Sequence, residues 1–258
     1  MLQAGGFGFH ESNYGDGMMV TYIILAAGKG NNLQPLTLKY AKTSFKLDEE
    51  TTVLQRMVRK IRKADRNAEI VVVVGYKAED VKKELEGENV KFVMNPFYEV
   101  TNSISSVWFA REYLERENLA IIHGDIVFSD DIILSYVVKP TDYPYVLADS
   151  SYSCPGAYNV VARGRQVLVM SKKLEHFSAR YCCMTKLDPV SSRLLKEEID
   201  SMVNNNMYDL YFEDSLVQMI MFHDFQLFFE DISGKKWAEV DTVDDLLAAQ
   251  EIHRRTNA

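Results

Sequence analysis

The sequence predicts an α/β fold, a Rossmann-like three-layer α/β/α arrangement with a mainly parallel sheet and an antiparallel accessory region. Short apolar runs, typical of strands buried on both faces, alternate with helical patterns as far as about residue 135. Beyond Tyr145 the strand-like segments are shorter and separated by turns, which favours antiparallel pairing. Apolar residues make up 47% of the 258 residues and charged residues 26%, the composition of an ordinary folded protein.

The first half of the chain alternates between strand and helix patterns. Buried strands are expected where apolar residues run almost without interruption, at 19–26, 70–74, 90–94 and 119–122. Helices are expected where apolar residues recur with a helical spacing, at 52–64, 79–85 and 103–115. Because strands that alternate with helices usually run parallel to one another, this half predicts the parallel part of the sheet.

The second half predicts shorter strands and three further helices. Strands are expected at 145–149, 157–162, 166–170 and 225–230, and helices at 189–202, 210–222 and 242–254. We find no internal repeat and no linker, so residues 19–258 are expected to form a single domain. Residues 1–18 are rich in glycine and have no apolar periodicity, which predicts a flexible N-terminal arm.

Composition and charge narrow the classes of partner. Asp and Glu number 37 against 29 Lys and Arg, and the formal net charge of −8 argues against a nucleic-acid partner. No apolar run approaches the roughly 20 residues that span a bilayer, so no membrane insertion is expected. The three cysteines cannot all pair with one another, and Cys182 and Cys183 are adjacent. We therefore expect reduced thiols and a cytoplasmic protein.

The turn after the first strand has the small residues of a phosphate-binding loop. Residues 24–37 read ILAAGKGNNLQPLT. Ala26, Ala27, Gly28 and Gly30 would let backbone N–H groups approach a phosphate closely. The spacing matches neither G-x-G-x-x-G nor a Walker loop, which disfavours a dinucleotide site and a P-loop ATPase. On spacing alone, a purely structural tight turn explains the segment equally well.

Two aspartates stand where a metal-phosphate site would need them. Asp125 follows a buried strand, in the motif HGDIVF, and ligands bind at the carboxyl ends of parallel strands. Asp241 precedes the last helix, in WAEVDT. Two carboxylates with phosphate oxygens are a ligand set that suits Mg²⁺. Each Asp taken alone also fits a turn residue or a helix N-cap.

Three motifs, in order along the chain, carry a family resemblance. L-A-A-G-x-G with P-L-T, then G-D-x-x-F, then W-x-E-x-D-T resemble the signature of sugar-nucleotidyltransferase-like enzymes, and the likeness extends from Val20 to Ala249. It implies a nucleotidyltransferase domain in which Asp125 and Asp241 are catalytic and bind Mg²⁺, and Lys42 is a catalytic phosphate contact. It also implies a nucleotide-binding role for the loop residues Leu25, Ala26, Ala27, Gly28, Lys29, Gly30 and Asn32.

Besides the mild change to Val240, where the family's last motif has Ile, two positions depart from the family pattern. The family usually has Arg two residues after the second glycine of the loop, where this chain has Asn32. Ala41 stands before Lys42, where the family usually has Pro. The first change removes a cation expected on the triphosphate, which Lys29 or Lys42 would have to replace. A nucleotide-binding relative with weakened catalysis therefore stays open as a reading.

Two further segments resemble a narrower branch, the bacterial choline-phosphate and aminoethylphosphonate cytidylyltransferases. In residues 95–110 the likeness implies that Asn102 faces the nucleotide, although Asn102 also fits a helix N-cap. In residues 208–216 it implies an acceptor pocket, where aromatic and acidic groups would attract an ammonium ion. Its candidates are Asp209, Tyr211, Phe212, Glu213 and Asp214. The same segment fits an amphipathic helix with its acids in solvent. Asp149 and Lys172 resemble residues that border the family's site.

The resemblance implies a reaction with two small partners. CTP and phosphocholine, or a similar phosphorylated amino-alcohol, would give CDP-choline and pyrophosphate with Mg²⁺ as cofactor. The alternatives are transfer to 2-aminoethylphosphonate or to a sugar-1-phosphate, and nucleotide binding with little or no catalysis. A homodimer is compatible with the sequence.

Overall fold

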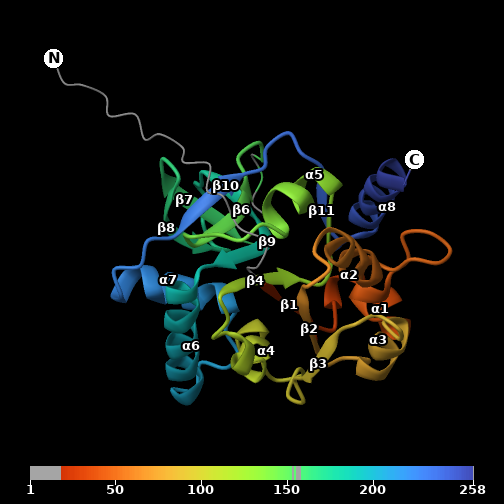
Figure 1. Ribbon diagram of the computed structural model, residues 1–258, viewed down its shortest axis with the longest axis horizontal. Coiled ribbons are helices and arrows are strands. Elements are labelled where there is room, and N and C mark those ends of the chain that lie inside the picture. Colours follow the sequence, from red (N-terminus) through yellow and green to blue (C-terminus); the bar gives the residue numbers. More distant parts are fainter. Residues whose placement is uncertain (1–18, 153, 155–157, 258) are drawn as a thin grey trace.

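The computed structural model describes residues 19–152, 154 and 158–257, and the predicted arm at 1–18 lies outside these residues. Nine strands of the described chain form one sheet, in the order β3-β2-β1-β4-β9-β6-β10-β8-β7 (Figure 1). Their bounds are β1 Val20–Ala26, β2 Glu69–Val74, β3 Lys91–Met94, β4 Asn118–His123, β6 Tyr145–Asp149, β7 Asn159–Arg163, β8 Gln166–Ser171, β9 Ala179–Leu187 and β10 Phe228–Asp231.

Both kinds of pairing occur in this sheet. β1 pairs in parallel with β2 and with β4, and β2 pairs in parallel with β3. β9 is antiparallel to both β4 and β6, and β7 pairs with β8 in an antiparallel hairpin. The predicted fold class is thereby confirmed. The strands of the first half pair in parallel and those of the second half mostly antiparallel, except that β10 pairs in parallel with β6.

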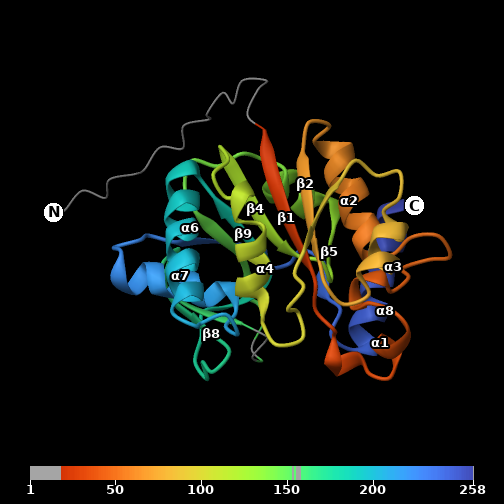
Figure 2. The same cartoon turned by 90° about the horizontal axis from the view of Figure 1, so that it is seen from below.

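Helices cover both faces of the sheet (Figure 2). The helices are α1 Leu36–Lys39, α2 Val53–Ala64, α3 Ala78–Glu84, α4 Ser103–Phe109, α5 Asp130–Ile132, α6 Pro189–Asn204, α7 Phe212–Phe222 and α8 Val243–Asn257. Alternate residues of β1 pack on opposite faces of the sheet. Tyr22 and Ile24 lie in a core with α2 and α3, and Ile23 lies in a second core with α4, α6 and α7. The period of two along a strand explains this division.

Helix boundaries follow from capping residues. Thr52 and Gln55 form a capping box at the start of α2, in which the Thr52 hydroxyl accepts from the Gln55 backbone N–H. Asp188 caps α6 by accepting from Val190 and Ser191, and Pro189 occupies the first turn. The predicted helix at 103–115 stops at Phe109 and continues as a short 3₁₀ turn, Arg111–Tyr113.

A separate ribbon joins distant parts of the chain. β5 (Ile126–Phe128) and β11 (Trp237–Glu239) pair antiparallel, with Glu239 opposite Ile126. Helix α8 follows β11, and Ala249 and Ile252 pack with Val127 in a third core. The ribbon therefore brings the segment after β4 beside the segment before α8.

The strand β9 and the ribbon were not predicted from the sequence. The apolar run of β9 is only four residues long, at 181–184, and the strand continues through Thr185 and Lys186, both fully buried. The strands of the ribbon have only three residues each, too few to show a period.

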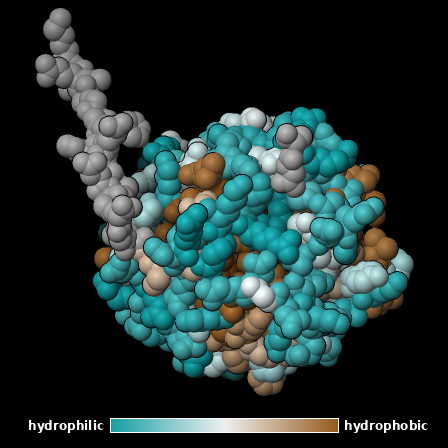
Figure 3. Space-filling model, turned by 45° about the vertical axis from the view of Figure 1, so that its right-hand side comes forward, coloured by the Kyte–Doolittle hydropathy of each residue, from teal (hydrophilic) through white to brown (hydrophobic). Residues whose placement is uncertain are grey.

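The described surface has no membrane-spanning element. No helix among the described residues is both long and apolar enough to cross a bilayer. Hydrophilic residues cover most of the face in Figure 3, and hydrophobic ones gather in separate patches.

Candidate active site

A cavity of about 720 Å³ opens beyond the carboxyl ends of β1, β3 and β4. The loop after β1 forms one wall, and acidic residues lie at the ends of β4 and β11. Tyr158, Lys172 and Tyr211 form the opposite wall. This is the edge at which open parallel sheets bind ligands.

The loop after β1 is shaped by close packing against Lys42. Gly30 has a left-handed backbone, with φ 65°, and a Cβ there would lie 2.9 Å from Cβ of Lys42. The Thr37 hydroxyl donates to the Gly30 carbonyl over 3.0 Å, which fixes the turn. Gly28 has open space where a Cβ would stand. The loop can therefore meet a ligand with its backbone, and its glycine at position 30 is sterically required.

Lys42 joins the two predicted aspartates. Its Nζ lies 2.6 Å from Oδ2 of Asp125 and forms an ion pair and hydrogen bond with Oδ1 of Asp241. The ribbon explains the meeting, because the backbone N–H of Val240 donates to the Asp125 carbonyl over 3.0 Å. Three residues far apart in the sequence thus form one charged cluster.

Electrostatics holds Lys42 and Asp125 in their ionised forms. Burial lowers the pKa of Lys42, but Asp125 and Asp241 outweigh burial and raise it well above its usual value. Burial raises the pKa of Asp125, but the charges of Lys42 and His123 outweigh it and lower the pKa below its usual value. The Lys42 ammonium and the Asp125 carboxylate therefore face each other as a charged pair.

The cluster has a free oxygen that fits a divalent cation. Oδ1 of Asp125 is buried and makes no hydrogen bond to another described residue. A buried carboxylate oxygen without a donor is costly unless a cation is bound nearby. Asp125 and Asp241 supply the hard oxygen ligands that Mg²⁺ prefers. The residues present fit such an ion.

Two more charged residues line the cavity beside the cluster. Glu239 precedes Asp241 by two residues and is 7% exposed, and burial and the two aspartates raise its pKa. His123 ends β4, and its Nε2 lies 2.8 Å from Oε1 of the fully buried Glu213. Burial lowers the pKa of His123, but Glu213 outweighs burial and raises it to about 9.

The opposite wall is aromatic and holds its own cation. The rings of Tyr158 and Tyr211 pack edge to face, with centroids 5.7 Å apart. Nζ of Lys172 lies 3.6 Å from the centroid of Tyr211 and 5.5 Å from that of Tyr158. The Tyr158 hydroxyl donates to Asp214 over 3.0 Å. The ring faces therefore already accept an ammonium group.

Comparison with known proteins shows which family this chain resembles. The profile of the nucleotidyl transferase family matches residues 21–142. The bifunctional protein GlmU of Caldicellulosiruptor saccharolyticus is 25% identical over 255 residues, which cover 91% of this chain and 49% of that protein. The choline-phosphate cytidylyltransferase of Streptococcus pneumoniae is 22% identical over 236 residues, which cover 91% of this chain and 99% of that protein. Residues 21–142 match the nucleotidyl transferase family, and 91% of the chain is similar to sugar-nucleotidyltransferase-like enzymes.

Solved structures share the fold of this nucleotidyltransferase. CTP:phosphocholine cytidylyltransferase from Streptococcus pneumoniae (LicC) has a TM-score of 0.73 at 20% identity, over 91% of this chain and 99% of that one. The inositol-1-phosphate CTP transferase from T. maritima also has a TM-score of 0.73, at 17% identity, over 92% and 97%. These similarities show the fold alone. The TM-score is the same for the two proteins, although their names give different acceptors.

The family confirms the predicted enzyme class, a nucleotidyltransferase. Its members use a nucleoside triphosphate, a phosphorylated acceptor and typically a divalent metal. The chain spans about half the length of the GlmU relative and nearly the whole of the cytidylyltransferase.

Most of the predicted nucleotide residues line the cavity of this nucleotidyltransferase. These are Leu25, Ala27, Gly28, Lys29, Gly30, Asn32 and Asn102, together with Lys42, Asp125 and Asp241. Ala26 is buried beneath the loop, where it packs in the core with α2. Asn102 is the N-cap of α4 and accepts from the Ser103 N–H over 2.9 Å, so it caps the helix and also faces the cavity.

The predicted acceptor segment reaches the cavity at one residue only among those described. Tyr211 lines the cavity, whereas Asp209, Phe212, Glu213 and Asp214 do not. Helix α7 begins at Phe212, so its first turn directs Phe212 and Glu213 into the protein, where both are fully buried. Asp214 accepts from the Tyr211 N–H, and Asp209 is exposed. The expected row of carboxylates around an ammonium ion is therefore replaced by acids behind the aromatic wall.

Sequence reasoning missed several residues of the cavity. Glu239 had a signal, since it stands two residues before Asp241 in the same motif, WAEVDT. His123 had one as well, since it ends the buried strand β4 just before Asp125. Tyr158 had none, because its position depends on β9, where the Tyr181 N–H donates to its carbonyl. Lys172 lines the cavity as expected, but Asp149 lies in a second cavity and accepts from the Trp237 indole N–H over 2.8 Å.

Proposed function

We propose that this nucleotidyltransferase transfers a cytidylyl group from CTP to phosphocholine or a similar phosphorylated amino-alcohol. The observation that carries the proposal is the Lys42–Asp125–Asp241 cluster, which lines the same cavity as the glycine loop and the aromatic wall. The similarity to a choline-phosphate cytidylyltransferase over 91% of the chain supports the choice of nucleotide and acceptor.

The proposed reaction needs positioning and charge neutralisation rather than a covalent enzyme intermediate. A phosphate oxygen of the acceptor forms a bond to the α-phosphorus of CTP, the bond to the β-phosphate breaks in line, and pyrophosphate leaves. The attacking oxygen is already anionic, so no general base is required. Backbone groups of the loop at 27–30 would hold the triphosphate, and Lys42 would neutralise its charge.

We propose Asp125 and Asp241 as the ligands of the divalent ion, with Mg²⁺ as the expected metal. When bound, the ion would offset the negative charge that gathers on the phosphates in the transition state. Lys42 lies between the two carboxylates in this structure. It would then turn toward the phosphates when the ion binds. This rearrangement explains how Lys42 and a divalent ion can both act at the same two carboxylates.

The aromatic wall supports an ammonium-bearing acceptor. Tyr158 and Tyr211 present ring faces on which Lys172 already lies, and a quaternary ammonium is bound by the same attraction. Asp214 accepts from the Tyr158 hydroxyl, and Asp214 and the buried Glu213 add negative potential at Tyr158. Lys172 would move to the acceptor's phosphate when the ammonium takes its place.

A second candidate is transfer to a phosphorylated acceptor without a cationic group, such as a sugar-1-phosphate. The observation that favours it is Lys172 itself, because a resident cation at the wall repels an ammonium ion. The predicted carboxylates also lie outside the cavity lining. Transfer to 2-aminoethylphosphonate is an intermediate case, because this acceptor carries a primary rather than a quaternary ammonium group.

The test is a panel of acceptors with CTP and Mg²⁺, read by pyrophosphate release. Phosphocholine, 2-aminoethylphosphonate and glucose-1-phosphate are compared at equal concentration, with Asp125→Asn as the inactive control. We expect the largest kcat/KM for phosphocholine. A preference for glucose-1-phosphate would overturn the ammonium acceptor, and no turnover with any triphosphate would favour the weakened nucleotide-binding relative. A cytoplasmic location and a homodimer stay predictions.

A further inference from the structure

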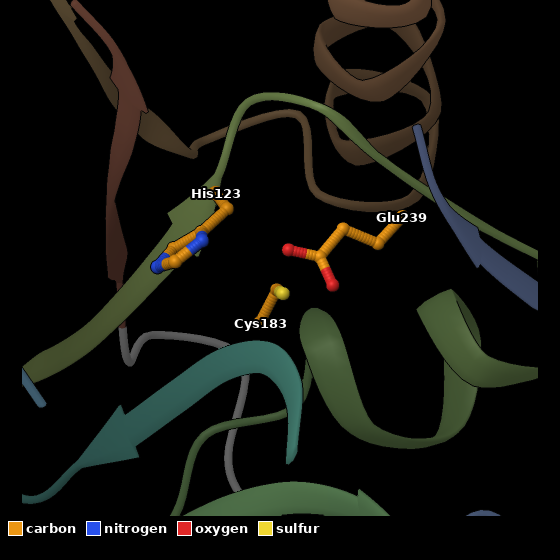
Figure 4. A group of neighbouring side chains, drawn as sticks. All are labelled: His123, Cys183 and Glu239. Atoms are coloured by element: carbon orange, nitrogen blue, oxygen red, sulfur yellow. The ribbon is translucent and has the colours of Figure 1, made fainter. Parts of the chain in front are cut away.

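Three side chains of different chemistry converge at the inner end of the cavity. Figure 4 shows His123, Cys183 and Glu239 pointing toward one another from three separate segments. One ligand atom from each, a ring nitrogen, the thiol sulfur and a carboxylate oxygen, lie within 4.8 Å of one another. Cys183 and Glu239 are nearly buried, at 2% and 7% exposure. Three donors of this kind, held this close, match the ligand set of a transition-metal site.

A distortion of β9 directs Cys183 toward this point. The register of β6 against β9 shifts between Val146 and Ala148, whose partners are Thr185 and Tyr181. Cys183 lies in the extra length of β9 and has a left-handed backbone, with φ 58°. A regular strand would alternate its side chains between the two faces, whereas a bulge redirects one of them. The chain therefore adopts an unfavourable conformation at the residue that supplies the sulfur.

His123 has the support that metal-binding histidines usually have. Its Nε2 lies 2.8 Å from Oε1 of Glu213, whose side chain is fully buried. A carboxylate on one ring nitrogen fixes the orientation of the ring and leaves the other nitrogen, Nδ1, for an ion. Arg180 contacts Glu239 at a single oxygen, Oε2, over 3.3 Å. These contacts use Nε2 of His123 and Oε2 of Glu239, so each side chain keeps one further atom that can bind a metal ion.

We propose that His123, Cys183 and Glu239 bind a transition-metal ion of the zinc class, at a site separate from the Asp125–Asp241 pair. The sulfur decides the class, because thiolate and imidazole ligands select Zn²⁺ and similar ions, whereas Mg²⁺ prefers oxygen. Cys183 binds as the thiolate, and its proton passes to solvent as the ion enters. His123 and Glu239 line the cavity, which provides the route of entry.

The proposed site has an open coordination position. Three protein ligands leave one place of a tetrahedral ion for water or for a group of a bound molecule. Glu239 ends β11 and precedes Asp241 by two residues, so an ion here would alter the field at the neighbouring carboxylates. The proposal rests on its own donor set and does not depend on the proposed reaction.

Co²⁺ is the probe, because a cobalt–thiolate bond has a charge-transfer absorption in the near ultraviolet. The metal-free full chain is titrated with Co²⁺, and we expect this band to appear and to saturate at one ion per chain. Zn²⁺ added in equal amount should abolish the cobalt spectrum, and a large excess of Mg²⁺ should not. A wild-type protein without the band, or a band removed by Mg²⁺, would overturn the proposal.

Two serine variants identify the sulfur. Cys183→Ser should lose the band, and Cys182→Ser should keep it. Cys182 is the matched control because it is adjacent and fully buried, but its thiol donates to the Arg180 carbonyl over 3.4 Å. Persistence of the band in Cys183→Ser, or its loss in Cys182→Ser with a native circular dichroism spectrum, would contradict the assignment.

A third variant tests the histidine support without touching a ligand. Glu213→Gln should weaken Zn²⁺ binding by about 10–100-fold, the usual effect of removing a hydrogen-bonding partner of a metal-binding histidine. Competition with a chromophoric zinc chelator measures this change. Unchanged Zn²⁺ affinity in a folded Glu213→Gln protein would show that His123 is not a ligand, and it would overturn the three-residue site.

Discussion

Lys42 and Asp241 form an ion pair across 199 residues of sequence. The pairing of β5 with β11 makes this contact possible, because it sets the end of β11 beside the turn after β4. Asp125 completes the cluster, with its Oδ2 at 2.6 Å from the same ammonium. The cluster places cationic and anionic groups where nucleotide phosphates and a divalent ion would meet.

Removing either carboxylate should abolish most of the activity without unfolding the protein. Asp125→Asn and Asp241→Asn keep the side-chain size but remove a metal ligand. We expect kcat/KM to fall by at least on the order of 100-fold, the scale of losing one electrostatic stabiliser. Asp244→Asn, an exposed position three residues from Asp241, is the control and should be unaffected. Near wild-type turnover of either variant at limiting Mg²⁺ would exclude that residue as a ligand.

Replacing Lys42 should separate catalysis from metal binding. Lys42→Met leaves the two carboxylates facing each other without a cation, so repulsion between them favours a divalent ion. We expect turnover to fall sharply, while Mn²⁺ binding, measured by electron paramagnetic resonance, is retained or tightened. Weaker Mn²⁺ binding would indicate that Lys42 organises the carboxylates rather than competing for them.

Restoring the cation of the family's loop should strengthen nucleotide binding. Asn32→Arg adds a charge at an exposed position of the cavity lining. A charge-assisted contact with phosphate is worth about 1–2 kcal/mol, or roughly tenfold in Kd for CTP. Calorimetric titration measures it, and Asn32→Gln controls for side-chain length. Equal affinity of the two variants would show that the loop directs position 32 away from the phosphates.

The aromatic wall should affect the acceptor more than the nucleotide. Tyr211→Leu removes the ring on which Lys172 lies. A desolvated cation–π contact is worth about 2 kcal/mol, so the phosphocholine KM should rise by roughly thirtyfold while the CTP KM changes little. Steady-state kinetics with each substrate varied in turn distinguishes the two. A parallel rise in both KM values would point to a general distortion of the cavity.

Removing Lys172 should change the preference between acceptors. In Lys172→Met no resident ammonium competes for the Tyr211 ring, whereas any lost phosphate contact affects all acceptors equally. The ratio of the phosphocholine Kd to the glucose-1-phosphate Kd should therefore fall. A ratio that rises would argue that the wall does not bind the ammonium group.

Lys186 should give stability a pH dependence that is independent of the active site. It is fully buried, its Nζ donates to the Val137 carbonyl over 2.6 Å, and burial lowers its pKa to about 7. The unfolded chain binds a proton at Lys186 up to about pH 10.4, so between these values the unfolded state holds more protons. The contribution of Lys186 to stability therefore rises with pH across this window.

Denaturant unfolding at pH 7 and pH 8 measures the effect of Lys186. The free energy of unfolding of wild type relative to Lys186→Met should increase between the two values. Comparison with Lys186→Met removes the contribution of other titrating groups, and Lys196→Met controls for the loss of a less buried lysine. A difference that is constant with pH would contradict a depressed pKa at Lys186.

The parallel half of the fold could be predicted because each element has a local signal. β1 and β2 are apolar runs, α2 has both a helical stripe and its Thr52 cap, and the loop at 27–30 follows directly from β1. Asp125 could be placed for the same reason, since a residue after a buried strand reaches the ligand edge of the sheet.

The remaining features of the fold and the site depend on contacts between distant segments, which cannot be predicted from any one segment alone. The bulge that aims Cys183 arises from the pairing of β6 with β9, and the cluster around Lys42 arises from the ribbon. The acceptor segment was misjudged for a local reason instead. Its aromatic and acidic residues were expected to share one surface, but Phe212 opens a helix and turns inward.

The most direct test of the central claim is identification of the product. The protein is incubated with CTP, phosphocholine and Mg²⁺, and the mixture is analysed by ³¹P NMR for a new pyrophosphate diester and for free pyrophosphate. We expect both to appear in equal amounts, and neither to appear with Asp125→Asn. Binding of CTP without formation of the diester, with phosphocholine or any other phosphorylated acceptor, would contradict the assignment of Lys42, Asp125 and Asp241 to nucleotidyl transfer.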